Sequence, residues 1–411
     1  MTHPIRPEHV APARLHPAWI VAAVAFLALI GAAGFRAAPG ALMVPLQDEF
    51  GWSTSVISLA VGVNLLLYGL TAPFAAALMD RFGVRQVVAT ALSVVAIGAG
   101  GSVFMTASWQ LLVFWGVLIG LGTGSMALVF AAIISNRWFY RRRGLVMGVL
   151  TAGSATGQLI FLPVVAHLAD SVGWRPASLV IAAAALAVAP VVWLVIRDHP
   201  EDRGALPYGA DASYTAPARA AGGAARRALE SLAFASRSRS FWALASAFAV
   251  CGATTNGLIG IHFIPSAHDH GMPATTAAGL LAVVGIFDIA GTIASGWLTD
   301  KFDPRRLLVL YYVFRGAGLL LLPQLLAATV HPSMVLFIVI YGLDWVATVP
   351  PTAALCQEIF GERGTIVFGW VFTAHQIGAA TAALGAGIIR DTFGSYTYAW
   401  WAGGALCALA A

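Results

Sequence analysis

The sequence LMDRFGVR, at residues 78–85, returns as LTDKFDPR at residues 298–305, a shift of 220 positions. Other matches at or near this offset are Arg143-Gly144 with Arg363-Gly364, Pro45 with Pro265, and DSVGW (170–174) with DTFGS (391–395), the last after one added residue. Self-similarity at a long fixed offset indicates that the chain consists of two related halves.

The chain is strongly apolar: 59% of its 411 residues are hydrophobic and 10% are charged, and its mean hydropathy is +0.82. The apolar residues come in blocks that are mostly long enough, as helices, to cross a hydrocarbon layer about 30 Å thick. The blocks are residues 18–46, 53–76, 86–106, 109–136, 144–169, 175–197, 241–266, 274–299, 306–327, 333–356, 364–389 and 396–411. We therefore predict an all-α polytopic membrane protein with twelve transmembrane helices in two six-helix repeats. The last block is short, which predicts a truncated final helix.

A segment rich in Pro, Gly, Ala and Arg, residues 198–240, separates the sixth block from the seventh and is typical of a linker. We expect a tail at residues 1–17, a six-helix bundle at 18–197, and a second bundle at 241–411. The tail has no short apolar region with a cleavage site, so we interpret it as cytoplasmic and not as a signal peptide.

Positive charge is unevenly distributed among the loops. With the N-terminus placed inside, nineteen of the 23 Lys and Arg residues fall in cytoplasmic segments, and only Arg175 and Arg390 fall in outer loops. This pattern predicts cytoplasmic N- and C-termini in a plasma (inner) membrane. The pI of about 9.4 then reflects topology and not a polyanionic ligand. We expect membrane lipids as partners and predict no nucleic-acid partner.

The twelve blocks, the central linker and the D-R-x-G-x-R loop at 80–85, echoed at 300–305, resemble the major facilitator superfamily. The resemblance implies a transporter whose two halves enclose a substrate site near the middle of the membrane. It also implies that the two loops latch the cytoplasmic side. The residues assigned to this gate are Asp80, Arg81, Arg85, Asp300, Lys301 and Arg305. The alternative is that they are solvated loop charges that only set topology.

Within the superfamily, APGALMVPLQDEFGWSTSVISLA (38–60) and an aspartate eight residues before Gly296 resemble the monocarboxylate and oxalate/formate exchanger branch. That branch often has a lysine where this chain has Gly40, and an arginine where it has Thr292. The resemblance implies transport of a small organic anion, a mono- or dicarboxylate, coupled to protons or to a counter-anion by symport or antiport. We expect the protein to act as a monomer.

Four charged residues lie inside the predicted helices, where each costs about 2.5–3.5 kcal/mol at the bilayer centre. They are Arg36, Asp288, Arg315 and Asp344. Because a guanidinium binds a carboxylate through two hydrogen bonds, we predict that Arg36 binds the anion. Asp288 is the candidate proton or ion-pair switch. Arg315 either contacts substrate or clamps Asp288 to Asp344, and Arg36 either binds substrate or belongs to a buried pair that only stabilises the fold.

Polar residues on the expected cavity helices complete the predicted site. The candidate substrate-binding residues are Arg36, Asn64, Tyr68, Asn256, His262, Asp288, His375 and Gln376, beside an intramembrane charge network of Arg315 and Asp344. The two histidines serve either packing or proton transfer, since imidazole titrates near neutral pH. Pro350-Pro351 are expected to break the tenth helix.

No catalytic triad, phosphate-binding loop or metal-ligand spacing is present, and the three cysteines are isolated. We therefore predict a protein that is not an enzyme and that needs no cofactor or metal. The alternative function is export of a neutral or amphiphilic toxic compound or drug, which the aromatic residues and the balanced intramembrane charges would permit.

Overall fold

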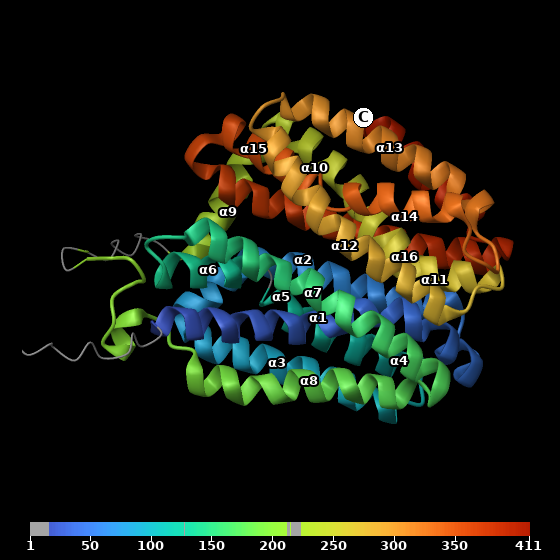
Figure 1. Cartoon of the computed structure of the whole chain (residues 1–411), viewed down its shortest axis with the longest axis horizontal. Coiled ribbons are helices and arrows are strands. Elements are labelled where there is room, and N and C mark those ends of the chain that lie inside the picture. Colours follow the sequence, from blue (N-terminus) through green and yellow to red (C-terminus); the bar gives the residue numbers. More distant parts are fainter. Residues whose placement is uncertain (1–15, 127, 212–213, 215–222) are drawn as a thin grey trace, which may run out of the picture.

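The computed structural model describes residues 16–126, 128–211, 214 and 223–411. The side chains of Arg36, Ala37, Leu128, Ser154 and Ala155 fall outside the described part, as does the predicted tail up to residue 15. Figure 1 shows two helical bundles, coloured blue to green and yellow to red, that lie against each other along their length.

The first half contains six spans, of which the fourth is built from several helical segments. Its helices are α1 Pro17–Phe50, α2 Thr54–Phe82, α3 Val84–Gly101 with η1 Ser102–Phe104, then α4 Ser108–Leu111, η2 Leu112–Ile119, α5 Gly120–Gly124 and α6 Leu128–Trp138 as the fourth span, followed by α7 Arg143–Ser171 and α8 Trp174–Val195.

The second half repeats this plan. Its helices are α10 Arg239–Gly252, η4 Ala253–Ile259 and α11 Gly260–Asp269 as one span, then α12 Ala274–Thr299, α13 Pro304–Leu325, α14 Pro332–Asp344 with α15 Val349–Phe360 as one interrupted span, η5 Gly361–Arg363, α16 Gly364–Phe393 and α17 Thr397–Ala410. Both η2 and η4 are π-helical.

The predicted count of twelve membrane-crossing helices is confirmed. Among the described residues, ten helical runs are long and apolar enough to cross a membrane. One of them, Pro332–Phe393, contains both the α14–α15 span and α16. The twelfth span, α17, has 14 residues and is shorter than the other spans.

The linker between the halves contains regular structure that its composition did not predict. It includes η3 Pro200–Arg203 and a twelve-residue helix, α9 Ala224–Ala235. The buried face of α9 is formed by Ala228, Ser231 and Ala235, which give little apolar signal. The Trp370 indole of α16 donates a hydrogen bond to the Ala228 carbonyl oxygen at 2.8 Å, which docks α9 onto the second half.

We call the end of the bundle next to α9 the linker end, and the opposite end, where α1 meets α2, the far end. At the far end, α1 stops at Gly51, whose φ of 66° places it in the left-handed region that favours glycine. The Ser53 hydroxyl then accepts a hydrogen bond from the Val56 N–H at 3.3 Å and begins α2.

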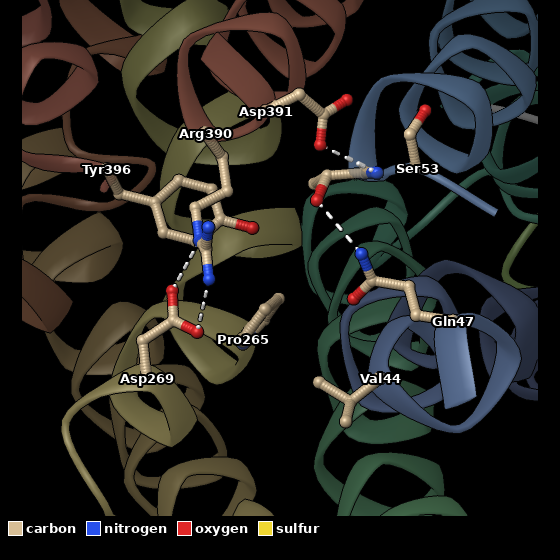
Figure 2. Close-up of a pocket in the computed structure, with 9 residues that line it drawn as sticks. Val44, Gln47, Ser53, Pro265, Asp269, Arg390, Asp391 and Tyr396 are labelled. Atoms are coloured by element: carbon tan, nitrogen blue, oxygen red, sulfur yellow. Dashed lines mark hydrogen bonds and ion pairs between the residues drawn. The ribbon is translucent and has the colours of Figure 1, made fainter. Parts of the chain in front are cut away.

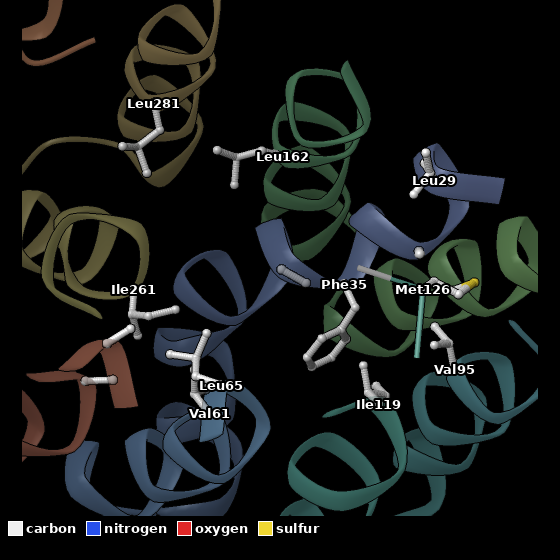
Figure 3. Close-up of a cluster of buried hydrophobic side chains, with 14 of the residues drawn as sticks. Leu29, Phe35, Val61, Leu65, Val95, Ile119, Met126, Leu162, Ile261 and Leu281 are labelled. Atoms are coloured by element: carbon white, nitrogen blue, oxygen red, sulfur yellow. The ribbon is translucent and has the colours of Figure 1, made fainter. Parts of the chain in front are cut away.

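Helices α2 and α16 form a central contact between the halves. Glycines on α2 permit the approach, because a Cβ added at Gly62 would lie 3.2 Å from the Ala380 carbonyl oxygen. The Thr373 hydroxyl of α16 donates to the Gly69 carbonyl oxygen of α2 at 3.1 Å. Apolar side chains from both halves, among them Val61 and Ile261, continue this contact in one buried cluster (Figure 3).

Inside the second half, α16 packs backbone to backbone against α10 and η4. A Cβ at Gly378 would clash with the Ala249 carbonyl oxygen, and a Cβ at Gly252 would clash with the His375 carbonyl oxygen. This close approach brings His375 of α16 beside η4, where Asn256 lies.

We therefore expect Gly378→Ala to lower the free energy of unfolding by about 1–3 kcal/mol, the usual range for overpacking. Chemical unfolding in mixed micelles measures the change. Gly385→Ala, on the same helix with open space around it, is the matched control and should cost nothing. Equal stability of the two variants would contradict the close backbone packing.

Candidate functional site

Helix α1 carries Arg36 to the boundary between the halves. The side chain of Arg36 lies outside the described residues, but its backbone is helical. One turn toward the far end, a Cβ added at Gly40 would lie 2.9 Å from the Ile261 carbonyl oxygen and 3.3 Å from that of Gly260. Helix α1 and the span made of α10, η4 and α11 both run from the linker end to the far end. One turn back along each therefore places the backbones of Arg36 and Asn256 at about the same level, as their sequence offset of 220 predicts.

An aromatic and amide cluster occupies this region of the second half. The Asn256 amide nitrogen lies 3.3 Å from His375 Nε2. The His375 ring stacks on Phe372, with centroids 5.7 Å apart and an interplanar angle of 7°, and lies 4.8 Å from the Phe248 ring. Phe372 also meets Tyr68 of α2 across the boundary, with ring centroids 6.1 Å apart. The structure thus brings Asn256, His375 and Tyr68 to one place.

Two buried polar atoms of this region have no hydrogen-bond partner among the described residues. They are His375 Nδ1 and Gln376 Oε1. The stem of Gln376 packs over Gly69 of α2, where an added Cβ would approach the Gln376 Cβ to 2.5 Å. An unsatisfied buried polar atom costs about 1–3 kcal/mol. A polar ligand that forms a hydrogen bond with either atom would remove this cost, so both atoms are available to such a ligand.

Two predicted site residues have other partners. The Asn64 amide donates to the Trp115 carbonyl oxygen at 2.7 Å and ties α2 to η2 inside the first half. His262 is fully buried, and its Nε2 lies 2.8 Å from the Ala383 carbonyl oxygen, so this nitrogen carries the proton. In this conformation both side chains hold helices together through these hydrogen bonds.

The intramembrane charges of the second half gather where α14 ends. The Arg315 guanidinium of α13 forms an ion pair of 2.6 Å with the Asp344 carboxylate. It also donates to the main-chain oxygens of Asp344 at 2.6 Å and Trp345 at 3.3 Å. Arg315 is 1% exposed and Asp344 is 5% exposed, so this pair is isolated from water.

Asp288 lies on the other side of the same interruption. Its carboxylate accepts a hydrogen bond from the Val346 N–H and another from the Thr292 hydroxyl, both at 3.1 Å. The Ser295 hydroxyl donates to the Ala347 carbonyl oxygen at 2.6 Å. No ion pair joins Asp288 to Arg315 in the part of the chain that the structure describes. Arg315 therefore clamps Asp344 directly, and Asp288 holds the backbone of the interrupted segment.

The break between α14 and α15 lies where Pro350-Pro351 predicted a break in the tenth helix. Pro350 and Pro351 lie in the first turn of α15, where their missing N–H groups leave no helical bond unmade. The chain between α14 and α15 leaves backbone groups that a membrane cannot hydrate. Side chains of α12 and α13 satisfy several of them.

The six predicted gate residues lie at the linker end. Asp80 pairs with Arg137 at 2.6 Å, and Arg85 lies over the Trp193 ring, 4.6 Å from its centroid; these partners are in the first half. Arg305 pairs with Glu358 at 2.9 Å in the second half.

The remaining gate residues make weaker contacts. Arg81 lies over the Phe82 ring and Lys301 over the Trp297 ring, whereas Asp300 has no hydrogen bond or ion pair from its side chain among the described residues. The ion pairs of the gate therefore stay within their own halves in this conformation.

Sequence reasoning missed Asp198, which follows α8. Its carboxylate accepts hydrogen bonds from the N–H groups of Val84 at 2.5 Å and Arg85 at 3.3 Å, at the start of α3. A cavity of about 1180 Å³ at this end is lined by Asp80, Asp198 and the start of α9. The only available signal was an acidic residue in a loop, and sequence does not indicate which helix such a residue caps.

A second, smaller cavity of about 360 Å³ lies at the far end between the halves (Figure 2). Its polar walls include Gln47 of α1, Asp269 of α11, and Arg390 and Asp391 of α16. Sequence reasoning assigned no role to these residues. Among the described residues, no group of His, Cys, Asp or Glu is arranged to hold a metal ion.

Comparison with known proteins agrees with this architecture. The family model described as Major Facilitator Superfamily matches residues 24–383. An uncharacterized MFS-type transporter of Bacillus subtilis, YcxA, is 26% identical over 92% of this chain and 90% of its own length. Monocarboxylate transporter 11 of Mus musculus is 28% identical over 92% of this chain and 82% of its own length.

Solved structures share the fold at low sequence identity. A bacterial homologue of the human lysosomal transporter Spinster aligns with a TM-score of 0.70 and 17% identity, covering 96% of this chain and 94% of the other. A D-xylose–proton symporter aligns with a TM-score of 0.72 and 15% identity, covering 95% of this chain and 96% of the other.

Proposed function

The chain belongs to the major facilitator superfamily of transporters, and we propose that it moves a small organic anion, a mono- or dicarboxylate, by alternating access. Coupling is to protons or to a counter-anion. The linker end faces the cytoplasm of a plasma (inner) membrane, as the positive-inside rule favours, and the protein acts as a monomer.

One observation carries the choice of an anion. Arg36 stands on α1 at the level of Asn256, beside the boundary where an alternating-access transporter holds its substrate. Of the two intramembrane arginines, Arg315 is already paired with Asp344. A guanidinium at such a level suits a carboxylate, because the two groups match through parallel hydrogen bonds. The named monocarboxylate transporters among the relatives support the same substrate class.

The neighbouring polar groups would orient the substrate once it is bound. Four side chains converge here from η4, α16 and α2, namely Asn256, His375, Tyr68 and Gln376. Asp288 would exchange the coupled proton, because both of its hydrogen bonds go to one carboxylate oxygen and the other oxygen can accept a proton without breaking them. Substrate binding would affect Asp288 through the interrupted α14–α15 span.

A binding screen tests the substrate class directly. Purified protein is heated with a panel of mono- and dicarboxylates and with their uncharged amides, at two pH values. A ligand at one hundred times its dissociation constant stabilises the folded state by about 2.7 kcal/mol, so a carboxylate substrate should raise the melting temperature where its amide does not. A stronger effect at one pH would support proton coupling. Stabilisation by the amides alone would contradict the anion proposal.

The aromatic boundary favours one alternative, export of a neutral or amphiphilic compound. Phe74 and Trp370 meet across the halves with centroids 6.0 Å apart, and Tyr68 and Phe372 continue this contact. Uptake and efflux assays in proteoliposomes with chemically distinct substrates separate the two functions. Transport of amphiphilic cations with no carboxylate flux would favour the exporter.

A further inference from the structure

The two halves are joined at the far end by a carboxylate bound to a helix start. Asp391, near the end of α16, accepts hydrogen bonds from the N–H groups of Thr54 at 3.0 Å and Ser55 at 2.7 Å. These groups open α2, which belongs to the other half (Figure 2). The first N–H groups of a helix have no partner within it and carry partial positive charge, so a carboxylate there is favoured twice.

The surrounding residues hold both partners in place. On the side of the second half, Arg390 forms two hydrogen bonds with Asp269, at 2.7 and 3.0 Å. The guanidinium is thereby directed toward Asp269, and Asp391 remains available to α2. On the side of the first half, the Gln47 amide donates to the Thr54 hydroxyl at 3.0 Å, which fixes the start of α2 to the end of α1.

The internal repeat offers a second place where such a contact would be expected. Asp170, at the end of α7, corresponds to Asp391 in the matching sequences DSVGW and DTFGS. Helix α7 packs against α12 as α16 packs against α2. Yet Asp170 is exposed and has no side-chain hydrogen bond or ion pair among the described residues. Helix α12 begins at Ala274, after Pro273, without a side-chain cap. Only the Asp391 contact has formed.

We propose that Asp391 is a releasable clasp that closes the far end of the transporter by capping α2 of the opposite half. The contact must break whenever the halves part at that end, so its strength biases the equilibrium between far-end-closed and far-end-open molecules. This inference goes beyond the proposed substrate and does not depend on it.

Distance measurements between spin labels test the clasp without any substrate. Labels are attached at Phe104→Cys and Thr329→Cys, two exposed far-end positions in opposite halves; the native cysteines are buried. Pulsed electron resonance then reports the open and closed populations. Asp391→Ala should raise the open-to-closed ratio by at least about tenfold, because it removes two charge-assisted hydrogen bonds and the loss of one would already account for that factor. Asp391→Asn keeps an acceptor without the charge and should lie between the alanine variant and the unmodified chain.

Asp170→Ala is the matched control, since it removes the corresponding carboxylate of the other half. It should leave the distance distribution unchanged. The clasp is overturned if Asp391→Ala leaves the distribution unchanged, or if Asp170→Ala shifts it equally. The measured quantity is a distance in the absence of substrate. Neither of these two contradicting outcomes therefore depends on whether the substrate is a carboxylate.

Discussion

Arg36→Ala is expected to lower the uptake of an organic anion by about 100-fold or more in proteoliposomes. The guanidinium would contribute two charge-assisted hydrogen bonds to the bound carboxylate, each about 1.5–3 kcal/mol. Each 1.4 kcal/mol is about a tenfold factor. The loss should appear in transport and in ligand-induced thermal stabilisation together, because both depend on the same contact.

Two further variants make the Arg36 result specific. Arg36→Lys keeps the charge but not the paired geometry, so it should retain more uptake than the alanine variant and less than the unmodified protein. Arg306→Ala removes an exposed cation at the linker end and should leave uptake unchanged. Full uptake by folded Arg36→Ala protein would overturn the role of Arg36 in binding the anion. Loss of the folded protein itself would instead support a buried pair that stabilises the fold.

Features that depend on local chemistry were predictable from sequence. Apolar blocks separated by charged loops predicted twelve membrane-crossing helices, since lipid excludes unpaired backbone groups. Pro350-Pro351 predicted the interruption of the tenth span, because proline lacks the N–H that a helix interior needs. The repeat offset of 220 residues matches Arg36 with Asn256, and the two backbones lie at about the same level.

Features that depend on partner choice were not predictable. Arg315 had two acidic neighbours at similar depth, and only three-dimensional packing shows that it pairs with Asp344 while Asp288 binds a backbone N–H. Asn64 looked like a cavity residue because a polar side chain on a membrane helix suggests one. Its partner is a main-chain carbonyl in another span, and every residue has such a carbonyl, so sequence carries no signal for it.

The largest effect on stability is expected at the Arg315–Asp344 pair. Arg315→Met leaves the Asp344 carboxylate buried without a counter-charge. Asp344→Asn likewise leaves the Arg315 guanidinium buried without a counter-charge. Breaking one side of a buried ion pair costs about 3–5 kcal/mol, so each variant should lower the free energy of unfolding by that amount, measured by chemical unfolding in mixed micelles. Arg390→Met breaks a partly exposed pair at the far end and should cost about 1 kcal/mol or less.

The double variant Arg315→Met/Asp344→Asn separates the two roles left open for Arg315. It removes both charges, so its loss of stability should be well below the sum of the single losses. Part of the loss should persist, because the carbonyls of Asp344 and Trp345 lose their donor. If Arg315 is a clamp, recovered stability should bring uptake back with it. If Arg315 also holds the substrate, the double variant should be stable but inactive in uptake. A loss of stability in either single variant as small as that of Arg390→Met would contradict the role of Arg315 as a clamp.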